Sequence, residues 1–77
     1  MAADTIVTVD VREDIRAGRE PFARIMSAVG GLEPGQSLVL INVFEPVPLY
    51  GVMAEKGYEH DTRRTAEGDW EIRFYRP

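Results

Sequence analysis

The chain has 77 residues, enough for one domain over residues 1–77 but too few for two. A domain of this size buries only roughly 60% of its unfolded surface, so it needs an economical core. Nine basic residues against thirteen acidic ones give a net charge of −4. This balance argues against nucleic-acid binding, which needs a positive surface to displace counterions from phosphates.

The sequence contains no cysteine, which excludes disulfides, thiolate metal sites and cysteine nucleophiles. The first ten residues lack the basic leader and long apolar stretch of a signal peptide. The longest apolar run is far too short to span a bilayer. We therefore expect a cytoplasmic protein without membrane association, either a monomer or a weak dimer.

Residues 5–11 alternate, with valines on one face, and predict the first strand. The charged segment 12–20 contains a glycine and predicts a loop. Pro21 suits the first position of a helix, where its missing N–H has no helical partner. The apolar residues that follow have the spacing of a helix with one buried face, and Gly30-Gly31 ends it.

A turn over residues 33–36, with proline second and glycine third, leads into the most apolar segment of the chain. Residues 38–41 predict a strand that is either buried on both faces or lies in the middle of a sheet. The strand ends at Asn42, and Pro46 and Pro48 fit the first turn of a second helix, which Gly57 ends.

Residues 58–65 and 70–76 predict two further strands, joined by a hairpin turn over 66–69. The first of these strands is more polar, so we expect it at an edge of the sheet. The order is then β-α-β-α-β-β, with the first two strands parallel and the last two antiparallel. This order predicts an α/β two-layer sandwich: a four-stranded mixed sheet with two helices on one face and the other face open.

The predicted core joins the apolar stripes of both helices to the inward face of the sheet. The helices should bury Phe22, Ile25, Met26, Val29, Leu49, Val52 and Met53, and the sheet Val7, Val9, Leu38, Leu40, Ile72 and Phe74.

Polar residues gather where the first two strands run out. Asp10, Arg12 and Arg19 lie near the end of the first strand, and Asn42 ends the second. Open α/β folds usually bind ligands at this edge. These residues could form a pocket for a small anion or a partner's carboxylate, since arginine offers a planar fork of donors. Alternatively, Asp10 and Arg12 make local ion pairs or loop hydrogen bonds.

Glu20 and Glu45 each precede a proline that opens a helix, so we expect both at N-cap positions on the same edge. Paired carboxylates can perform acid–base chemistry, but helix N-termini favour their ionised form. Capping is the interpretation favoured for Glu20. Recognition is favoured for Glu45, which Phe44 and the rigid segment 46–48 hold beside Asn42.

His60 is the single histidine and has no clustered ligands, so we interpret it as a strand residue and expect no metal. Arg63, Arg73 and Tyr75 could form a docking surface on the open face, although neighbouring acids could pair with the arginines across strands. The sequence has no glycine-rich phosphate-binding loop, no Gly-x-Ser-x-Gly nucleophile elbow, no His-Glu-x-x-His zinc motif and no dinucleotide-binding fingerprint. We expect no cofactor and no catalytic residues.

Four segments together resemble the TusA/SirA-like superfamily, and more closely a cysteine-less branch known as a domain of unknown function. They are Val9-Asp10-Val11-Arg12, Glu20-Pro21-Phe22, residues 32–38 and, above all, residues 42–49. Sulfur carriers of the TusA type open the first helix with Cys-Pro, and the cysteine carries a persulfide. Glu20-Pro21 stands at that place, so sulfur transfer does not carry over. The branch often has an acidic residue after the asparagine, where this chain has Val43.

The resemblance implies an accessory role in redox or nitrogen-oxide metabolism, since members of the branch occur alone or fused to modules such as haemerythrin-like domains. The favoured function is thus a non-catalytic module that binds a protein partner or a small ligand, through Asp10, Arg12, Glu20, Asn42, Phe44 and Glu45. One alternative is a metabolite-binding or catalytic domain that uses Asp10, Arg12, Glu20, Asn42 and Glu45. Another is a partner in a sulfur relay that carries no sulfur itself.

Overall fold

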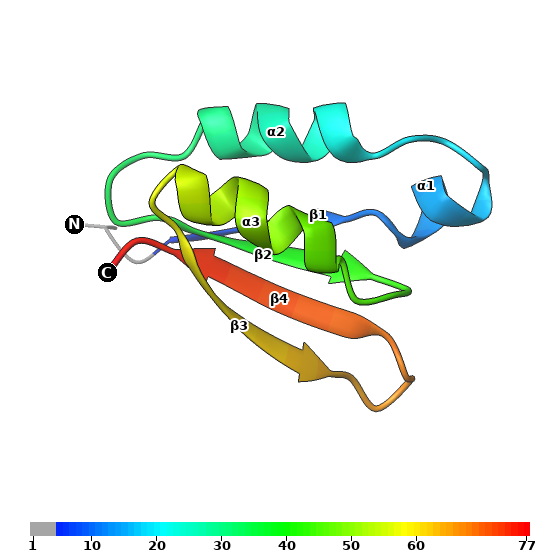
Figure 1. The fold of residues 1–77 in the computed structure, drawn as a ribbon. Helices are drawn as coiled ribbons and strands as arrows, with labels where there is room; N and C mark the ends of the chain where they lie inside the picture. Colours follow the sequence, from blue (N-terminus) through cyan, green and yellow to red (C-terminus); the bar gives the residue numbers. More distant parts are fainter. Residues whose placement is uncertain (1–4) are drawn as a thin grey trace.

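The computed structural model describes residues 5–77 and contains one four-stranded mixed sheet with three helices (Figure 1). The strands are β1 (Ile6–Asp10), β2 (Ser37–Asn42), β3 (Glu59–Arg64) and β4 (Trp70–Tyr75), and the helices are α1 (Arg12–Arg16), α2 (Phe22–Gly30) and α3 (Val47–Glu55). The strand order is β1-β2-β4-β3. Helices α2 and α3 lie over one face of this sheet (Figure 1), so the predicted two-layer α/β sandwich is confirmed.

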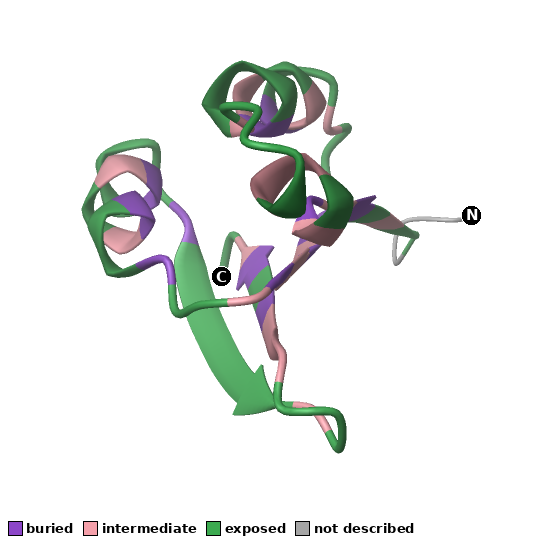
Figure 2. Cartoon of the chain, turned by 90° about the vertical axis from the view of Figure 1, so that its right-hand side faces the viewer, coloured by how far each residue is buried: buried purple, intermediate pink, exposed green. Residues whose placement is uncertain are grey.

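The strand pairing follows the predicted directions. β1 and β2 are parallel, with Val9 opposite Leu40, whereas β4 is antiparallel to both β2 and β3. The polar strand β3 lies at an edge, and all of its residues are exposed (Figure 2). β2 is central, but its burial alternates: Leu38 and Leu40 are fully buried, while Val39 and Ile41 are only half-buried on the open face. That open face is the side of the sheet away from α2 and α3.

The core lies between the sheet and the two longer helices. It comprises Val9, Val11, Ile25, Val29, Leu38, Leu40, Leu49, Met53, Tyr58, Ile72 and Phe74. Val11, which was not predicted to be buried, belongs to it, and so does Tyr58, which was expected in the core or on a face of the sheet. Met26, Val52 and Val7 only pack against its margin. The prediction that Phe22 is buried was wrong, because it begins α2 at the margin of the core and remains 46% exposed.

The predicted loop over 12–20 is also wrong in part, because residues 12–16 form the short helix α1. Five residues leave no room for a full apolar stripe, so periodicity gave no signal. The helix instead has acidic Glu13 and Asp14 in its first turn and Arg16 in its last, which complement its dipole. Ile15 packs against the core and anchors α1 to the domain.

Two chain reversals fix the ends of the long elements. At Gly35, φ is 87° and the N–H of Gln36 donates to the carbonyl of Glu33 at 3.0 Å, as the predicted type II turn requires. α3 ends in a Schellman motif: Gly57 has φ of 91°, and the N–H of Tyr58 donates to the carbonyl of Met53. The motif places Tyr58 in the core. No helix within residues 5–77 is long and apolar enough to cross a bilayer.

Candidate functional site

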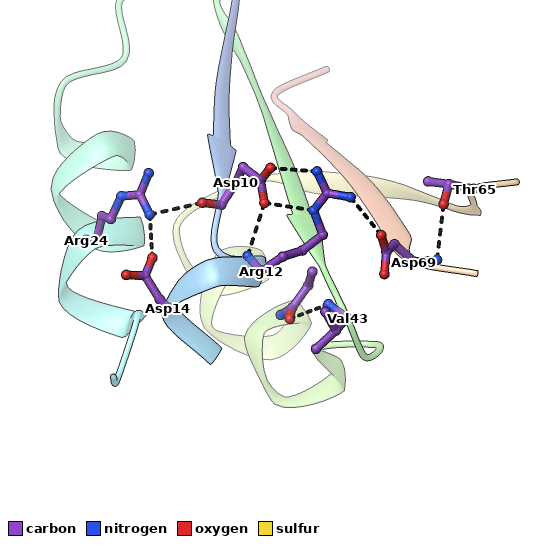
Figure 3. A network of polar contacts seen from close by, with 8 residues as sticks. Asp10, Arg12, Asp14, Arg24, Val43, Thr65 and Asp69 are labelled. Carbon is purple, nitrogen blue, oxygen red and sulfur yellow. Dashed lines mark hydrogen bonds and ion pairs between the residues drawn. The ribbon is translucent and has the colours of Figure 1, made fainter. Parts of the chain in front are cut away.

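The carboxyl end of β1 carries a network of charged side chains centred on Arg12 (Figure 3). Nε and Nη2 of Arg12 donate to the two carboxylate oxygens of Asp10 at 3.0 and 2.8 Å. Nη1 donates to Oδ2 of Asp69, in the turn of the β3–β4 hairpin, at 2.7 Å. The backbone N–H of Arg12 also donates to Asp10, at 3.0 Å. The side chain therefore ties the end of β1 to the hairpin.

This network favours the ionised forms of Asp10 and Arg12. The hydrogen bond from the Arg12 side chain lowers the pKa of Asp10, and the hydrogen bond from Asp10 raises the pKa of Arg12. Because carboxylates of the chain itself occupy both ends of the Arg12 fork, an anionic ligand would have to displace them. The geometry thus favours the local ion-pair interpretation of Asp10 and Arg12 over the ligand pocket.

A second ion-pair group joins α1 to α2 beside the first. Asp14 accepts from Nε of Arg19 at 3.0 Å and from Nη1 of Arg24. The same Nη1 donates to the backbone carbonyl of Asp10 at 3.0 Å (Figure 3). The hydrogen bond from Arg19 is the main cause that lowers the pKa of Asp14. Arg19 therefore serves the α1–α2 connection and does not join Asn42.

An apolar cleft opens at this end of the sheet, between the N-terminal parts of α2 and α3. It has a volume of about 290 Å³. It is lined by Glu20, Pro21, Phe22, Ile25, Asn42, Phe44, Pro46, Pro48, Leu49 and Val52. Phe22 and Phe44 are among its lining residues yet 46% and 48% exposed, so two large rings present apolar surface to solvent. This set of ten residues is the α2–α3 cleft.

Two polar residues line the α2–α3 cleft. Asn42 is only 2% exposed, and its Oδ1 accepts the backbone N–H of Val43 at 2.7 Å. Glu20 is exposed, and its Oε1 accepts the N–H of Phe22 at 2.7 Å. Glu20 therefore satisfies a first-turn N–H, as a cap does. The expected N-cap position was wrong, however: Pro21 is the N-cap of α2, and Glu20 precedes it.

Glu45 has a different environment. The N-cap of α3 is Pro46, so the predicted N-cap position of Glu45 was wrong as well. Its carboxylate accepts the hydroxyl of Tyr50 at 3.1 Å, and the same hydroxyl lies 2.6 Å from Oγ1 of Thr62. Glu45 does not line the cleft, although both its neighbours do. Its carboxylate links α3 to the edge strand β3 through Tyr50.

The single histidine is part of the same cluster. His60 stacks face to face on Tyr50, with ring centroids 3.8 Å apart and planes within 2°. Burial raises the pKa of the Tyr50 hydroxyl. No group of three or more histidine, cysteine, aspartate or glutamate side chains suited to a metal occurs among residues 5–77. The cluster therefore consists of packing and hydrogen bonds between α3 and β3.

The structure divides the six candidate residues into three places. Glu20, Asn42 and Phe44 meet in the α2–α3 cleft, Asp10 and Arg12 form the charged network, and Glu45 joins Tyr50. Neither the apolar lining of the cleft as a site nor Asp69 as a partner of Arg12 was predicted from the sequence. The repeated Glu-Pro at 20–21 and 45–46 was the available signal, since both helix starts border the cleft.

Comparison with known proteins gives one match. The model of a family described as "Uncharacterized conserved protein (DUF2249)" matches residues 8–76. No curated protein and no solved structure matches. The match includes β1 from Thr8 onward, every later element, and all residues of the α2–α3 cleft.

Proposed function

The chain belongs to the DUF2249 family, and we propose that it acts as a non-catalytic accessory module that binds a partner protein through the α2–α3 cleft. The observation that carries this proposal is the pairing of two half-exposed phenylalanines with a concave apolar surface. Aromatic residues around a desolvated pocket are typical of the few interface positions that dominate binding energy.

The size of the cleft favours a side chain of a partner over a large cofactor. Its volume of about 290 Å³ lies just below the range for small-molecule sites, about 300–1,000 Å³. Pro46 and Pro48 border it with backbone of restricted flexibility, which reduces the ordering cost of binding. One apolar anchor from a partner would fill it.

Charge adds a preference to this proposal. Of the residues that the structure describes, Glu20 is the single charged one that lines the cleft, and the whole chain has a net charge of −4. A partner segment with a basic residue next to its apolar anchor would therefore complement the rim. Acid–base catalysis by Glu20 and Glu45 is not part of the proposal, because each carboxylate already accepts a hydrogen bond elsewhere.

Two further parts of the proposal come from the sequence. We place the protein in the cytoplasm and in a TusA/SirA-like lineage in which Glu20-Pro21 stands where sulfur carriers have Cys-Pro. The β-α-β-α-β-β order, apart from the added α1, supports the lineage. An accessory role in redox or nitrogen-oxide metabolism follows from the resemblance and is proposed on that basis.

The test is selection of binding peptides from a phage-displayed random library, followed by affinity measurement on variants. Phe22→Ala and Phe44→Ala should each weaken the selected peptides roughly tenfold or more, as expected for interface anchors. Ile6→Ala is the matched control, since Ile6 is 51% exposed but lies on the open face. Enriched sequences should combine an aromatic or aliphatic residue with lysine or arginine.

Three results would count against the proposal. These are a selection that yields no enriched sequence, peptides that bind the phenylalanine variants as well as the wild type, and an Ile6→Ala variant that weakens the peptides equally. Amide chemical shifts recorded with a selected peptide then locate the contact directly, and shifts confined to the open face would also overturn it.

A further inference from the structure

A second cavity lies at the opposite end of the sheet, where β2 begins and β4 ends. It has a volume of about 290 Å³ and is lined by the turn that leads into β2 and by residues at the two ends of the β3–β4 hairpin. Four of its lining residues carry donors that matter below: Gln36, Ser37, Arg73 and Arg76. We call this the arginine cavity. Ser37 begins β2, whereas the α2–α3 cleft contains Asn42 at the strand's other end.

Among residues 5–77, neither arginine of this cavity forms an ion pair with a carboxylate. Within residues 5–77, ion pairs form at Arg12, Arg19, Arg24 and Arg63. Arg73 instead donates from Nη2 to the hydroxyl of Ser37 at 3.3 Å, and Arg76 donates from Nη2 to the carbonyl of Lys56 at 3.3 Å. Both bonds are long beside the roughly 2.7–2.9 Å of strong charge-assisted pairs, so both guanidinium groups keep donors to offer.

Aromatic rings support both guanidinium groups. The Arg73 group lies 5.6 Å from the centroid of the Tyr75 ring, and the Arg76 group lies 4.6 Å from that of Tyr58. Such contacts orient an arginine without neutralising it. Along β4, Arg73 follows the alternation of the open face and Arg76 that of the helix-covered face. The two side chains thus reach one cavity from both sides of the sheet.

The charge of this cavity differs from that of the other cavities described. It is lined by two arginines and one carboxylate, Glu33, a balance of +1. Among the described residues that line the α2–α3 cleft, only Glu20 is charged, which gives a net charge of −1. A third cavity, on the open face, has Asp61, Arg63, Glu71 and again Arg73 as its charged lining residues, which gives a net charge of zero. A positive concave site in a chain of net charge −4 attracts anions locally against the overall field.

Neutral donors lie beside the arginines. Oε1 of Gln36 accepts the N–H of Glu33 at 2.7 Å, which leaves its NH₂ group as the part available to a ligand. The oxygen of Ser37 accepts from Arg73, so its O–H proton can be donated. Tyr75 lines the cavity on the side away from Gln36 and Ser37. This side is acidic, since nearby Asp61 raises the pKa of the Tyr75 hydroxyl. An anion is therefore expected at the Gln36–Ser37 side.

We propose that the arginine cavity binds the phosphate or carboxylate group of a small metabolite, held by Arg73 and Arg76. The planar donor fork of arginine matches both kinds of oxyanion. This inference does not depend on the function proposed for the α2–α3 cleft, because the two sites share no lining residue.

The test is an NMR titration that follows the side-chain Nε–H signals of the arginines. Sodium phosphate and sodium succinate are added in separate series, with ionic strength held constant by sodium chloride. The Arg73 and Arg76 signals should shift saturably with at least one anion. Saturation with phosphate alone identifies a phosphate-bearing ligand, and saturation with succinate alone a carboxylate-bearing one.

Three variants test whether the arginine cavity is the site that binds the anion. Arg73→Gln and Arg76→Gln should each weaken the affinity roughly tenfold or more, since each removes a charge-assisted contact. Arg64→Gln should leave it unchanged: Arg64 also has neutral partners, the Gly68 carbonyl and the Trp70 ring, but lines none of the three cavities. Arg76→Gln guards against misfolding, because it leaves the Arg73–Ser37 bond in place.

Non-saturating shifts with both anions would overturn the proposal. Equal weakening by Arg64→Gln would overturn it too, because the effect would then reflect net charge alone. Neither result would bear on peptide binding at the α2–α3 cleft.

Discussion

Arg12 and Asp69 are 57 positions apart in the sequence, yet Nη1 of Arg12 donates to Oδ2 of Asp69 at 2.7 Å. The Arg12 side chain also donates two hydrogen bonds to the Asp10 carboxylate. It therefore joins the end of β1 to the turn between β3 and β4. The backbone N–H of Asp69 in turn donates to Oγ1 of Thr65 at 3.1 Å, which holds the turn in shape (Figure 3). Asp69 directly precedes β4, and β2 lies between β1 and β4, so this contact bridges the end of the central strand β2.

Removing either partner of the Arg12–Asp69 contact should lower the melting temperature. Arg12→Gln and Asp69→Asn should each destabilise, and the double variant should melt little below the worse single one, because both remove the same bond. Arg63→Gln is the control, since the Arg63–Glu71 pair is largely exposed and such pairs contribute little. Strictly additive losses in the double variant would show that the two residues act independently.

Acid should destabilise the protein through Asp10 and Asp14. Arg12 and Arg19, respectively, are the main causes that lower the pKa of each carboxyl in the folded state. Stability from these residues is therefore complete above the unfolded pKa, about 3.9, and is lost as pH falls below about 4 toward the folded values.

Asp10→Asn should make the loss of stability in acid shallower, as measured by thermal melts between pH 2 and pH 6. Glu67→Gln removes the same charge at an exposed position in the hairpin turn and serves as the control. An unaltered acid profile in Asp10→Asn would show that Asp10 is not among the residues that set acid stability.

The two ends of the α2 stripe should respond differently to truncation. Ile25 is 4% exposed, and Ile25→Ala should reduce the free energy of unfolding by roughly 2–5 kcal/mol, the usual cost of such a cavity. Phe22 is 46% exposed, and Phe22→Ala should change it by no more than about 1 kcal/mol. Urea unfolding of both variants tests this, and a larger loss for Phe22→Ala would reverse our assignment of the buried face.

Replacing Glu20 or Glu45 by glutamine should affect stability and peptide affinity differently. Glu20→Gln keeps an acceptor for the N–H of Phe22 but removes the charge near the helix dipole, so it should cost about 0.3–1 kcal/mol. It should also weaken peptides with a basic residue, because Glu20 lines the cleft. Glu45→Gln should leave peptide affinity unchanged, because its carboxylate faces Tyr50. This reverses the roles expected from sequence, and a loss of affinity confined to Glu45→Gln would restore them.

The sequence by itself determined the elements that carry a regular pattern. Alternating valines predicted β1, the spacing of Ile25 and Val29 predicted α2, and the polarity of residues 58–65 predicted an edge strand. These features follow from periods of 2.0 and 3.6 residues, which are local properties of the chain. The parallel and antiparallel directions followed as well, since connections of these lengths allow few alternatives. Helix α1 was not predicted because its four charged residues and single isoleucine carry no apolar period.

Only the tertiary structure decided how the polar residues divide. The sequence placed Asp10, Arg12, Glu20, Asn42 and Glu45 at one end of the sheet, but it could not give the direction of each side chain. Long charged side chains take the orientation that their partners fix, and those partners, such as Asp69 for Arg12, come from distant parts of the chain. The same holds for the arginine cavity, where the start of β2 meets the end of β4 because they are antiparallel neighbours.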